Sequence, residues 1–128
     1  MIFLLEDDPK RVAWFESLFT GRLLAARTVE AGLRLLEERG GEPLEFAFLD
    51  HDLELAEGSD DLLHSGTMFV NKVLTEELRY PGLRKAGKVV IHSMNPVGAS
   101  GMLDALLAAG IDADLIPYHQ LQRRLKVG

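Results

Sequence analysis

The sequence MIFLLEDDPKRVAWFESLFTG, residues 1–21, contains one complete strand–helix unit. Ile2–Leu5 is an unbroken apolar run, which is typical of a parallel strand buried on both faces. The acidic residues after it are of a type that caps helices, and Pro9 suits the first turn of a helix. Apolar residues then recur at helical spacing until Gly21, where the pattern ends. This stretch predicts an α/β protein.

The same alternation of a short apolar run and an amphipathic segment repeats along the remaining chain. Four more strands are predicted, at Leu23–Val29, Phe46–Leu49, Lys88–Ile91 and Asp114–Ile116. Helices are predicted at Glu30–Arg39, Thr67–Arg79 and Pro96–Gly110 (with Leu103, Leu106 and Leu107 facing inward), and a short one after Tyr118. Five such units predict one domain over residues 1–128. Its five-stranded parallel sheet is expected in the flavodoxin-like order 2-1-3-4-5, with helices on both faces.

Composition excludes several classes of function. The net charge is −6, and the largest basic group is Arg123, Arg124 and Lys126, so extended nucleic-acid binding is not expected, whereas a small phosphorylated ligand is. The chain has no cysteine, which rules out disulfides and thiolate metal sites. No apolar run approaches the roughly 20 residues of a membrane span, and no signal peptide is evident, so we expect a cytoplasmic protein. No protein partner is indicated.

Polar residues follow four of the predicted strands at the point where each strand ends. They are Glu6, Asp7 and Asp8; Asp50, His51 and Asp52; His92, Ser93 and Asn95; and Tyr118 and His119. Ligands of parallel sheets bind at this edge, near the point where the strand order reverses. We therefore expect Asp7, Asp8 and Asp50 to meet in one cleft.

Three carboxylates in one cleft repel each other unless a cation lies among them, and Mg²⁺ suits such oxygen ligands. Other interpretations stay open at this point. Asp7 or Asp8 can be a helix cap, Asp50 can be a nucleophile, and Ser93 and Asn95 can be turn formers. The acidic loop at residues 54–65, which includes His64, is either a solvated surface or a lid over the site.

Two motifs resemble the response-regulator receiver domain: FLLEDDP at Phe3–Pro9 and FLDHDL at Phe48–Leu53. The resemblance implies that Asp7 and Asp8 bind Mg²⁺ together with Asp50, which would accept a phosphoryl group. Ser93 falls where receivers keep a Ser or Thr. One departure is that Ile116 precedes Pro117, where receivers have a lysine.

Three further motifs resemble an offshoot of the receivers, the cyclic-phosphate-processing receiver-like domain. They are DHDL at Asp50–Leu53, Gly66-Thr67 at a helix start, and HSMNPVG at His92–Gly98. This resemblance implies metal-assisted processing of cyclic phosphates on nucleotides or nucleotide-like molecules.

The leading hypothesis from the sequence is therefore a metal-dependent phosphoesterase. The metal would be Mg²⁺ held by Asp7, Asp8 and Asp50, with Mn²⁺ as an alternative, or Zn²⁺ on His51 and His92. His51 and His92 would be general base and general acid, since imidazole titrates near neutral pH. The phosphate would be bound by Ser93, Asn95, Gly98 and Thr67. The rival hypotheses are a signalling receiver phosphorylated on Asp50 and a non-catalytic module that binds a metal or a nucleotide.

Overall fold

A computed structural model describes residues 1–53 and 65–125. Its sheet has five parallel strands in the order β2-β1-β3-β4-β5, as the sequence predicted. The strands are β1 (Ile2–Leu5), β2 (Leu23–Ala26), β3 (Phe46–Leu49), β4 (Lys88–Ile91) and β5 (Ala113–Leu115). The helices are α1 (Pro9–Leu18), α2 (Val29–Arg39), α3 (Gly66–Thr75), α4 (Pro96–Ala108) and α5 (Tyr118–Arg124). The expected lid lies almost entirely outside the described residues.

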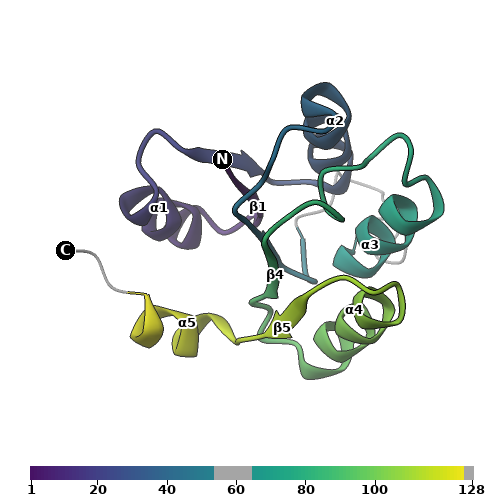
Figure 1. Ribbon diagram of the computed structural model, residues 1–128. Helices are drawn as coiled ribbons and strands as arrows, with labels where there is room; N and C mark the ends of the chain where they lie inside the picture. Colours follow the sequence, from purple (N-terminus) through teal and green to yellow (C-terminus); the bar gives the residue numbers. More distant parts are fainter. Residues whose placement is uncertain (54–64, 126–128) are drawn as a thin grey trace, which may run out of the picture.

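The helices form a layer on each face of the sheet (Figure 1). Helices α1 and α5 lie on one face, and α2, α3 and α4 cover the other. β1 shows why both layers are needed, because none of its four side chains is exposed. Phe3 and Leu5 pack in the α2–α4 core, whereas Ile2 and Leu4 pack in the α1–α5 core. Successive side chains of a strand point to opposite faces, so an unbroken apolar run satisfies both cores.

A small polar residue caps each of the first four helices. The Asp8 side chain accepts a hydrogen bond of 2.8 Å from the backbone N–H of Lys10, which identifies Asp8 rather than Asp7 as the cap of α1. Thr28, Ser65 and Asn95 cap α2, α3 and α4 in the same way. Such caps satisfy backbone N–H groups that have no partner inside the helix.

The predicted ends of the second strand and of the third helix were wrong, because helix capping and core burial determine where these elements end. The second strand ends at Ala26 and does not reach Val29, because Thr28 caps α2 and accepts from the N–H of Ala31. Helix α3 ends at Thr75 instead of at residue 79. The chain turns after it so that Tyr80 becomes buried while Leu78 points into solvent.

Helix α4 and β5 also differ from the prediction. Helix α4 ends at Ala108, two residues early, and its buried side chains are Ala99, Met102 and Leu106. Leu107, expected inside, is half exposed, whereas Leu103 packs partly against the core. β5 begins one residue early, at Ala113. The apolar pattern of α4 is almost continuous, so spacing alone does not select its inner face.

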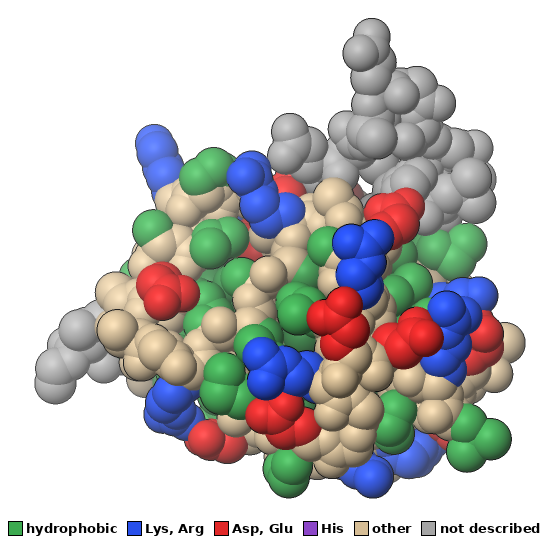
Figure 2. Space-filling view, turned by 90° about the horizontal axis from the view of Figure 1, so that it is seen from above, with side chains coloured by type: hydrophobic (Ala, Val, Ile, Leu, Met, Phe, Trp, Pro, Cys, Tyr) green, Lys and Arg blue, Asp and Glu red, His purple; other side chains and the backbone are tan. Residues whose placement is uncertain are grey.

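The surface carries charges of both signs. On the face shown in Figure 2, Lys and Arg side chains stand among Asp and Glu side chains, with apolar atoms between them. Contacts to a nucleic-acid backbone require clustered basic side chains. This face does not have a uniformly basic surface of that kind. None of the helices in the described part of the chain is long and apolar enough to cross a bilayer.

Candidate functional site

Four polar side chains are buried within the described residues, and each follows the end of a strand. They are Glu6 after β1, Asp50 after β3, and His92 and Ser93 after β4. In the register of the sheet, Leu5 pairs with Leu49 and Leu49 pairs with Ile91. The next residue of each strand therefore lies at the same level, and Glu6, Asp50 and His92 come together. Each offers a ligand atom within 4.8 Å of the other two.

Glu6 is at the centre of this group. Its Oε1 lies 3.0 Å from Nε2 of His92 and 3.6 Å from Nη1 of Arg11. Its Oε2 accepts hydrogen bonds from the backbone N–H groups of Asp7 and Asp8, at 2.9 and 3.2 Å. The carboxylate is fully buried, and these donors replace the water that it loses.

His92 is a neutral imidazole in this setting. Burial lowers its pKa to about 4, although the negative charge of Asp50 acts in the opposite direction. The ring packs against Phe15 with centroids 5.2 Å apart, and within the described residues Nδ1 has no hydrogen-bond partner. The proton is therefore on Nε2, which donates to Glu6. The expected titration near neutral pH does not apply to this histidine.

The pKa of Asp50 is shifted in the opposite direction from that of His92. Burial, followed by the adjacent negative charge of Glu6, raises the pKa of Asp50 to about 7. Its Oδ1 accepts a hydrogen bond of 2.9 Å from the backbone N–H of His51. Two neighbouring buried carboxyl groups cannot both ionise cheaply, so the pair holds either a proton or a cation.

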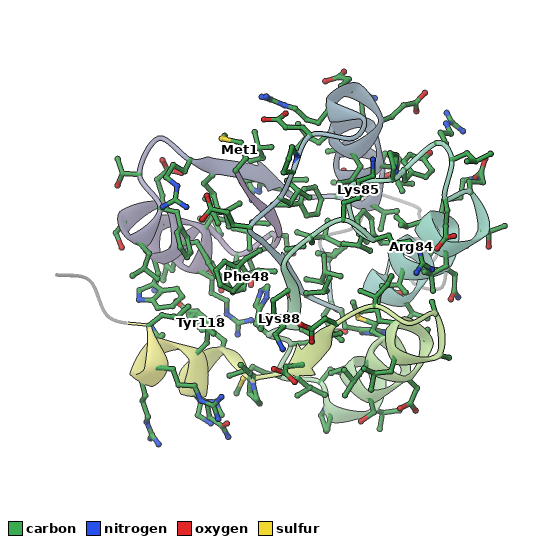
Figure 3. All side chains as sticks on the ribbon, in the orientation of Figure 1. Met1, Phe48, Arg84, Lys85, Lys88 and Tyr118 are labelled. Atoms are coloured by element: carbon green, nitrogen blue, oxygen red, sulfur yellow. The ribbon has the colours of Figure 1, made fainter. Side chains whose placement is uncertain are left out.

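Glu6 and Asp50 form the floor of an open cleft of about 680 Å³. The described residues that line it are Glu6, Asp7, Asp8, Pro9, Arg11, Arg27, Asp50, Asp52 and Met94. Arg11 lies over the ring of Tyr118 at 4.9 Å, and Figure 3 shows Tyr118 between α1 and α5. Ion pairs of 3.6 and 3.9 Å bring the guanidinium of Arg11 near Glu6 and Asp8 without a hydrogen bond to either. The cleft thus combines acidic groups with cationic N–H donors.

His51 belongs to a second network, which reaches the cleft through Asp52; His51 itself is not among the described residues that line the cleft. Its Nδ1 lies 2.9 Å from Oδ1 of Asp52, and that oxygen also accepts a bond of 3.2 Å from Nδ2 of Asn95. The ring lies flat against Gly98, where a Cβ atom would be 2.5 Å from ring carbons. His92 lies with Glu6 and Asp50, so the hydrogen-bond partners of the two imidazole rings differ.

The other residues expected to bind phosphate lie at or near the starts of α4 and α3. The Ser93 hydroxyl is buried and accepts from the backbone N–H of Asn95 at 3.1 Å. Asn95 accepts from the backbone N–H of Gly98, which is therefore already occupied. Thr67 is the second residue of α3 and is not part of the described lining of the cleft.

Glu6 and Arg11 are residues of the site that the sequence reasoning passed over. For Glu6 the signal was present, since Glu6, Asp50 and His92 each lie one residue beyond a strand end. Asp7 and Asp8 lie two and three residues beyond it. Asp7 does line the cleft, and Asp8 lines it while also capping α1.

The donor set fits a divalent cation. Glu6 and Asp50 offer adjacent carboxylate oxygens, and a cation would offset both causes of the raised pKa of Asp50, its burial and the charge of Glu6. The Nε2–H of His92 holds Glu6 in place, in the manner of groups that orient metal ligands. Oxygen ligands of this kind suit Mg²⁺ or Mn²⁺. The two imidazoles are in separate networks, which does not support the Zn²⁺ variant.

Comparison with known proteins gives one matching family description, the cyclic-phosphate processing receiver domain, over residues 1–108. No curated protein matches the chain significantly. Several solved structures share its fold. A CheY-like response regulator receiver domain protein from Methanospirillum hungatei JF-1 has a TM-score of 0.57 and 20% identity, over 96% of this chain and 87% of that one.

Two other similar structures are response regulators with 16% identity to this chain. One is the phosphorylated cyanobacterial phytochrome response regulator RcpA, with a TM-score of 0.60 over 98% of this chain and 87% of that one. The other is the Mn²⁺-bound form of Rcp1, with a TM-score of 0.59 over 97% of this chain and 84% of that one. At these identities the similarity establishes the receiver fold alone.

Proposed function

Since the chain belongs to the cyclic-phosphate processing receiver domain family, we propose that it is a divalent-cation-dependent phosphoesterase that opens small cyclic phosphodiesters. The observation that carries the proposal is the floor of the cleft. There two buried carboxylates, Glu6 and Asp50, lie side by side under an open cavity, and His92 holds one of them. Such a pair has little structural purpose unless a charged ligand occupies the cleft.

Glu6 and Asp50 would hold the cation, with Asp7 beside them in the wall of the cleft. When bound, a divalent cation polarises phosphoryl oxygens and neutralises the charge that develops on them. The similar structure of Rcp1 is a Mn²⁺-bound form, which supports a divalent metal on a fold of this kind. Mg²⁺ and Mn²⁺ are the proposed metals, because the proposed ligands are carboxylates.

Arg11 would bind the phosphate. Its guanidinium lines the cleft and is held over Tyr118, and no described residue accepts a hydrogen bond of normal length from it. A planar guanidinium with free N–H donors suits two oxygens of one phosphate. The cleft would therefore accept a phosphate only after the acidic floor has been neutralised.

His51 would be the general base. Asp52 would hold the ring through Nδ1, and the other ring nitrogen would take a proton from water. The hydroxide part of that water then bonds to phosphorus, one P–O ester bond breaks, and the departing alkoxide takes a proton from solvent in the open cleft. The product is a phosphomonoester. His92 is a positioning residue in this scheme, because it is neutral and contacts Glu6.

The test is turnover of 2′,3′-cyclic nucleotides and of glycerol 1,2-cyclic phosphate with Mg²⁺ or Mn²⁺. We expect Glu6→Gln and Asp50→Asn to lower kcat/KM by about 10²–10³-fold. Asp8→Asn is the matched control, since Asn still caps α1 and the substitution also removes one carboxylate from the cleft. No turnover by the native protein, or equal losses in all three variants, would overturn the proposal.

A specific observation also supports a second candidate, phosphorylation of Asp50. This carboxyl lines the cleft, and the similar response regulator RcpA is a phosphorylated protein. The departure at Ile116 weighs against it, and the described cleft lining has arginines but no lysine. Incubation with acetyl phosphate and Mg²⁺, followed by mass spectrometry, separates the two functions. A stable acyl phosphate on Asp50 would favour signalling.

A further inference from the structure

A second, smaller cavity lies beside the acidic cleft. It has a volume of about 210 Å³ and is bounded by the β4–α4 loop, α4 and the segment from β5 into α5. Met94 lines both cavities, so the two cavities share one residue of their walls. Nothing in the proposed chemistry of the cleft uses this second cavity.

The walls of the smaller cavity are mostly apolar. Pro96, Leu115 and Pro117 supply aliphatic surface, and Met94 supplies a thioether that is nearly half exposed. Three polar residues, Ser93, Ser100 and His119, also line the cavity. The Met94 sulfur lies 3.4 Å from Nδ1 of His119, which fixes the position of the methionine between the two cavities.

These features suit one planar ring. An apolar cavity of about 150 Å³ is large enough for benzene, so a cavity of this size admits a heteroaromatic ring. Thioether sulfur packs favourably against aromatic rings, and proline and leucine surfaces are apolar enough to cover a ring face. Ser100 and His119 can hydrogen-bond to ring nitrogen or oxygen atoms, which an alkyl chain would leave unused.

We propose that this cavity binds a planar heteroaromatic ring of the nucleobase class, covalently linked to the phosphate that occupies the acidic cleft. The assignment of the phosphate end rests on the function proposed above, whereas the ring site rests on the smaller cavity itself. The shared wall at Met94 matches a molecule whose ring and phosphate are close neighbours, as they are in a nucleoside cyclic phosphate. The substrate class is therefore a nucleotide rather than a cyclic phosphate without a ring.

Binding of the ring can be tested without any catalysis. The chain has four methionines, Met1, Met68, Met94 and Met102, and only Met94 borders the cavity. With methionine methyl groups labelled with ¹³C, adenosine should shift the Met94 signal saturably, whereas ribose should not shift it. Ser100→Phe should abolish the shift, because it places a ring in the cavity. Ser17→Phe, a matched change on the exposed surface of α1, should leave the shift intact.

Kinetics give the second arm of the test. Ser100→Phe should raise KM for adenosine 2′,3′-cyclic phosphate about tenfold and leave KM for glycerol 1,2-cyclic phosphate unchanged. An unshifted Met94 signal with adenosine, or equal behaviour of the two Phe variants, overturns the ring site even where both substrates turn over. A saturable shift that Ser100→Phe removes supports the ring site even where no cyclic phosphate turns over. That result would overturn the phosphoesterase function alone.

Discussion

Asp50 and His92 are neighbours whose pKa values are displaced in opposite directions. Burial and Glu6 raise the pKa of Asp50 from 3.8 to about 7. Burial lowers the pKa of His92 from 6.5 to about 4. Both shifts favour the uncharged form, which is the expected response of ionisable groups to a dry environment. Without a cation, Asp50 is therefore kept uncharged by binding a proton, and His92 by not binding one.

These shifts predict opposing effects on stability. Between pH 4 and 7 the native state binds a proton on Asp50 that the unfolded state has released, so this contribution falls as pH rises. Between pH 4 and 6.5 the unfolded state binds a proton on His92 that the native state lacks, so that contribution rises with pH. In the native sequence the two slopes largely cancel.

Asp50→Asn should reveal the contribution of His92 to the pH dependence of stability. Relative to the native protein, its free energy of unfolding should rise with pH between about 4 and 7, with a slope approaching ~1.4 kcal/mol per pH unit, because the falling contribution of Asp50 is gone. His92→Asn should show the reverse, a relative fall between about 4 and 6.5. Urea denaturation with a chelator present measures both slopes. Parallel curves for all three proteins would contradict the arrangement of charges described here.

Arg11 supports a second prediction at the scale of single residues. Arg11→Gln should weaken binding of inorganic phosphate to the cation-loaded protein about tenfold or more, because a charge-assisted pair of hydrogen bonds is lost. Arg123→Gln, on the last turn of α5 and outside the cleft lining, is the control. Isothermal titration measures both affinities. Equal affinities of the two variants would remove Arg11 from the site.

At the scale of elements, the start of α3 is fixed by close backbone contact. A Cβ atom on Gly66 would lie 2.1 Å from the carbonyl oxygen of Asp50 and 2.9 Å from Cα of His51. The backbone N–H of Gly66 donates to the carbonyl oxygen of His51 at 2.8 Å. Helix α3 thus packs directly on the loop that presents the site, and only glycine allows this approach.

Gly66→Ala should therefore destabilise the fold by about 1–3 kcal/mol, because backbone atoms must move apart. Gly101→Ala is the contrasting change, since a Cβ atom there meets nothing within 4 Å and the residue is inside α4. It should stabilise the protein by about 0.5–1 kcal/mol through helix propensity. Thermal and urea unfolding compare the two. A neutral Gly66→Ala would show that the contact is looser than described.

At the scale of the whole molecule, the cleft couples cation binding to stability. A ligand that binds only the native state at 100 times its Kd adds about 2.7 kcal/mol to the free energy of unfolding. For a domain of this size we expect Mn²⁺ or Mg²⁺ to raise Tm by roughly 5–10 °C over the chelated protein. Glu6→Gln should abolish this rise and Asp8→Asn should retain it. Differential scanning calorimetry with and without chelator checks the prediction.

Periodicity predicted most of the fold. β1, β3 and β4 have the predicted bounds, because their apolar residues are buried on both faces of a parallel sheet, apart from Phe46 at the start of β3. The ends of β2 and α3 could not be predicted from periodicity. They depend on the cap at Thr28 and on burial of Tyr80, a contact made several residues after the helix.

The sequence by itself determined the order of elements and the edge of the sheet where polar groups gather, because both follow from local patterns of apolar and polar residues. Only the tertiary structure decided which of those groups share a dry space. The sheet register aligns Glu6 with Asp50 and His92, and helix capping leaves Asp8 at the surface. Burial and charge proximity are properties of distant segments in contact, so no single stretch of sequence contains them.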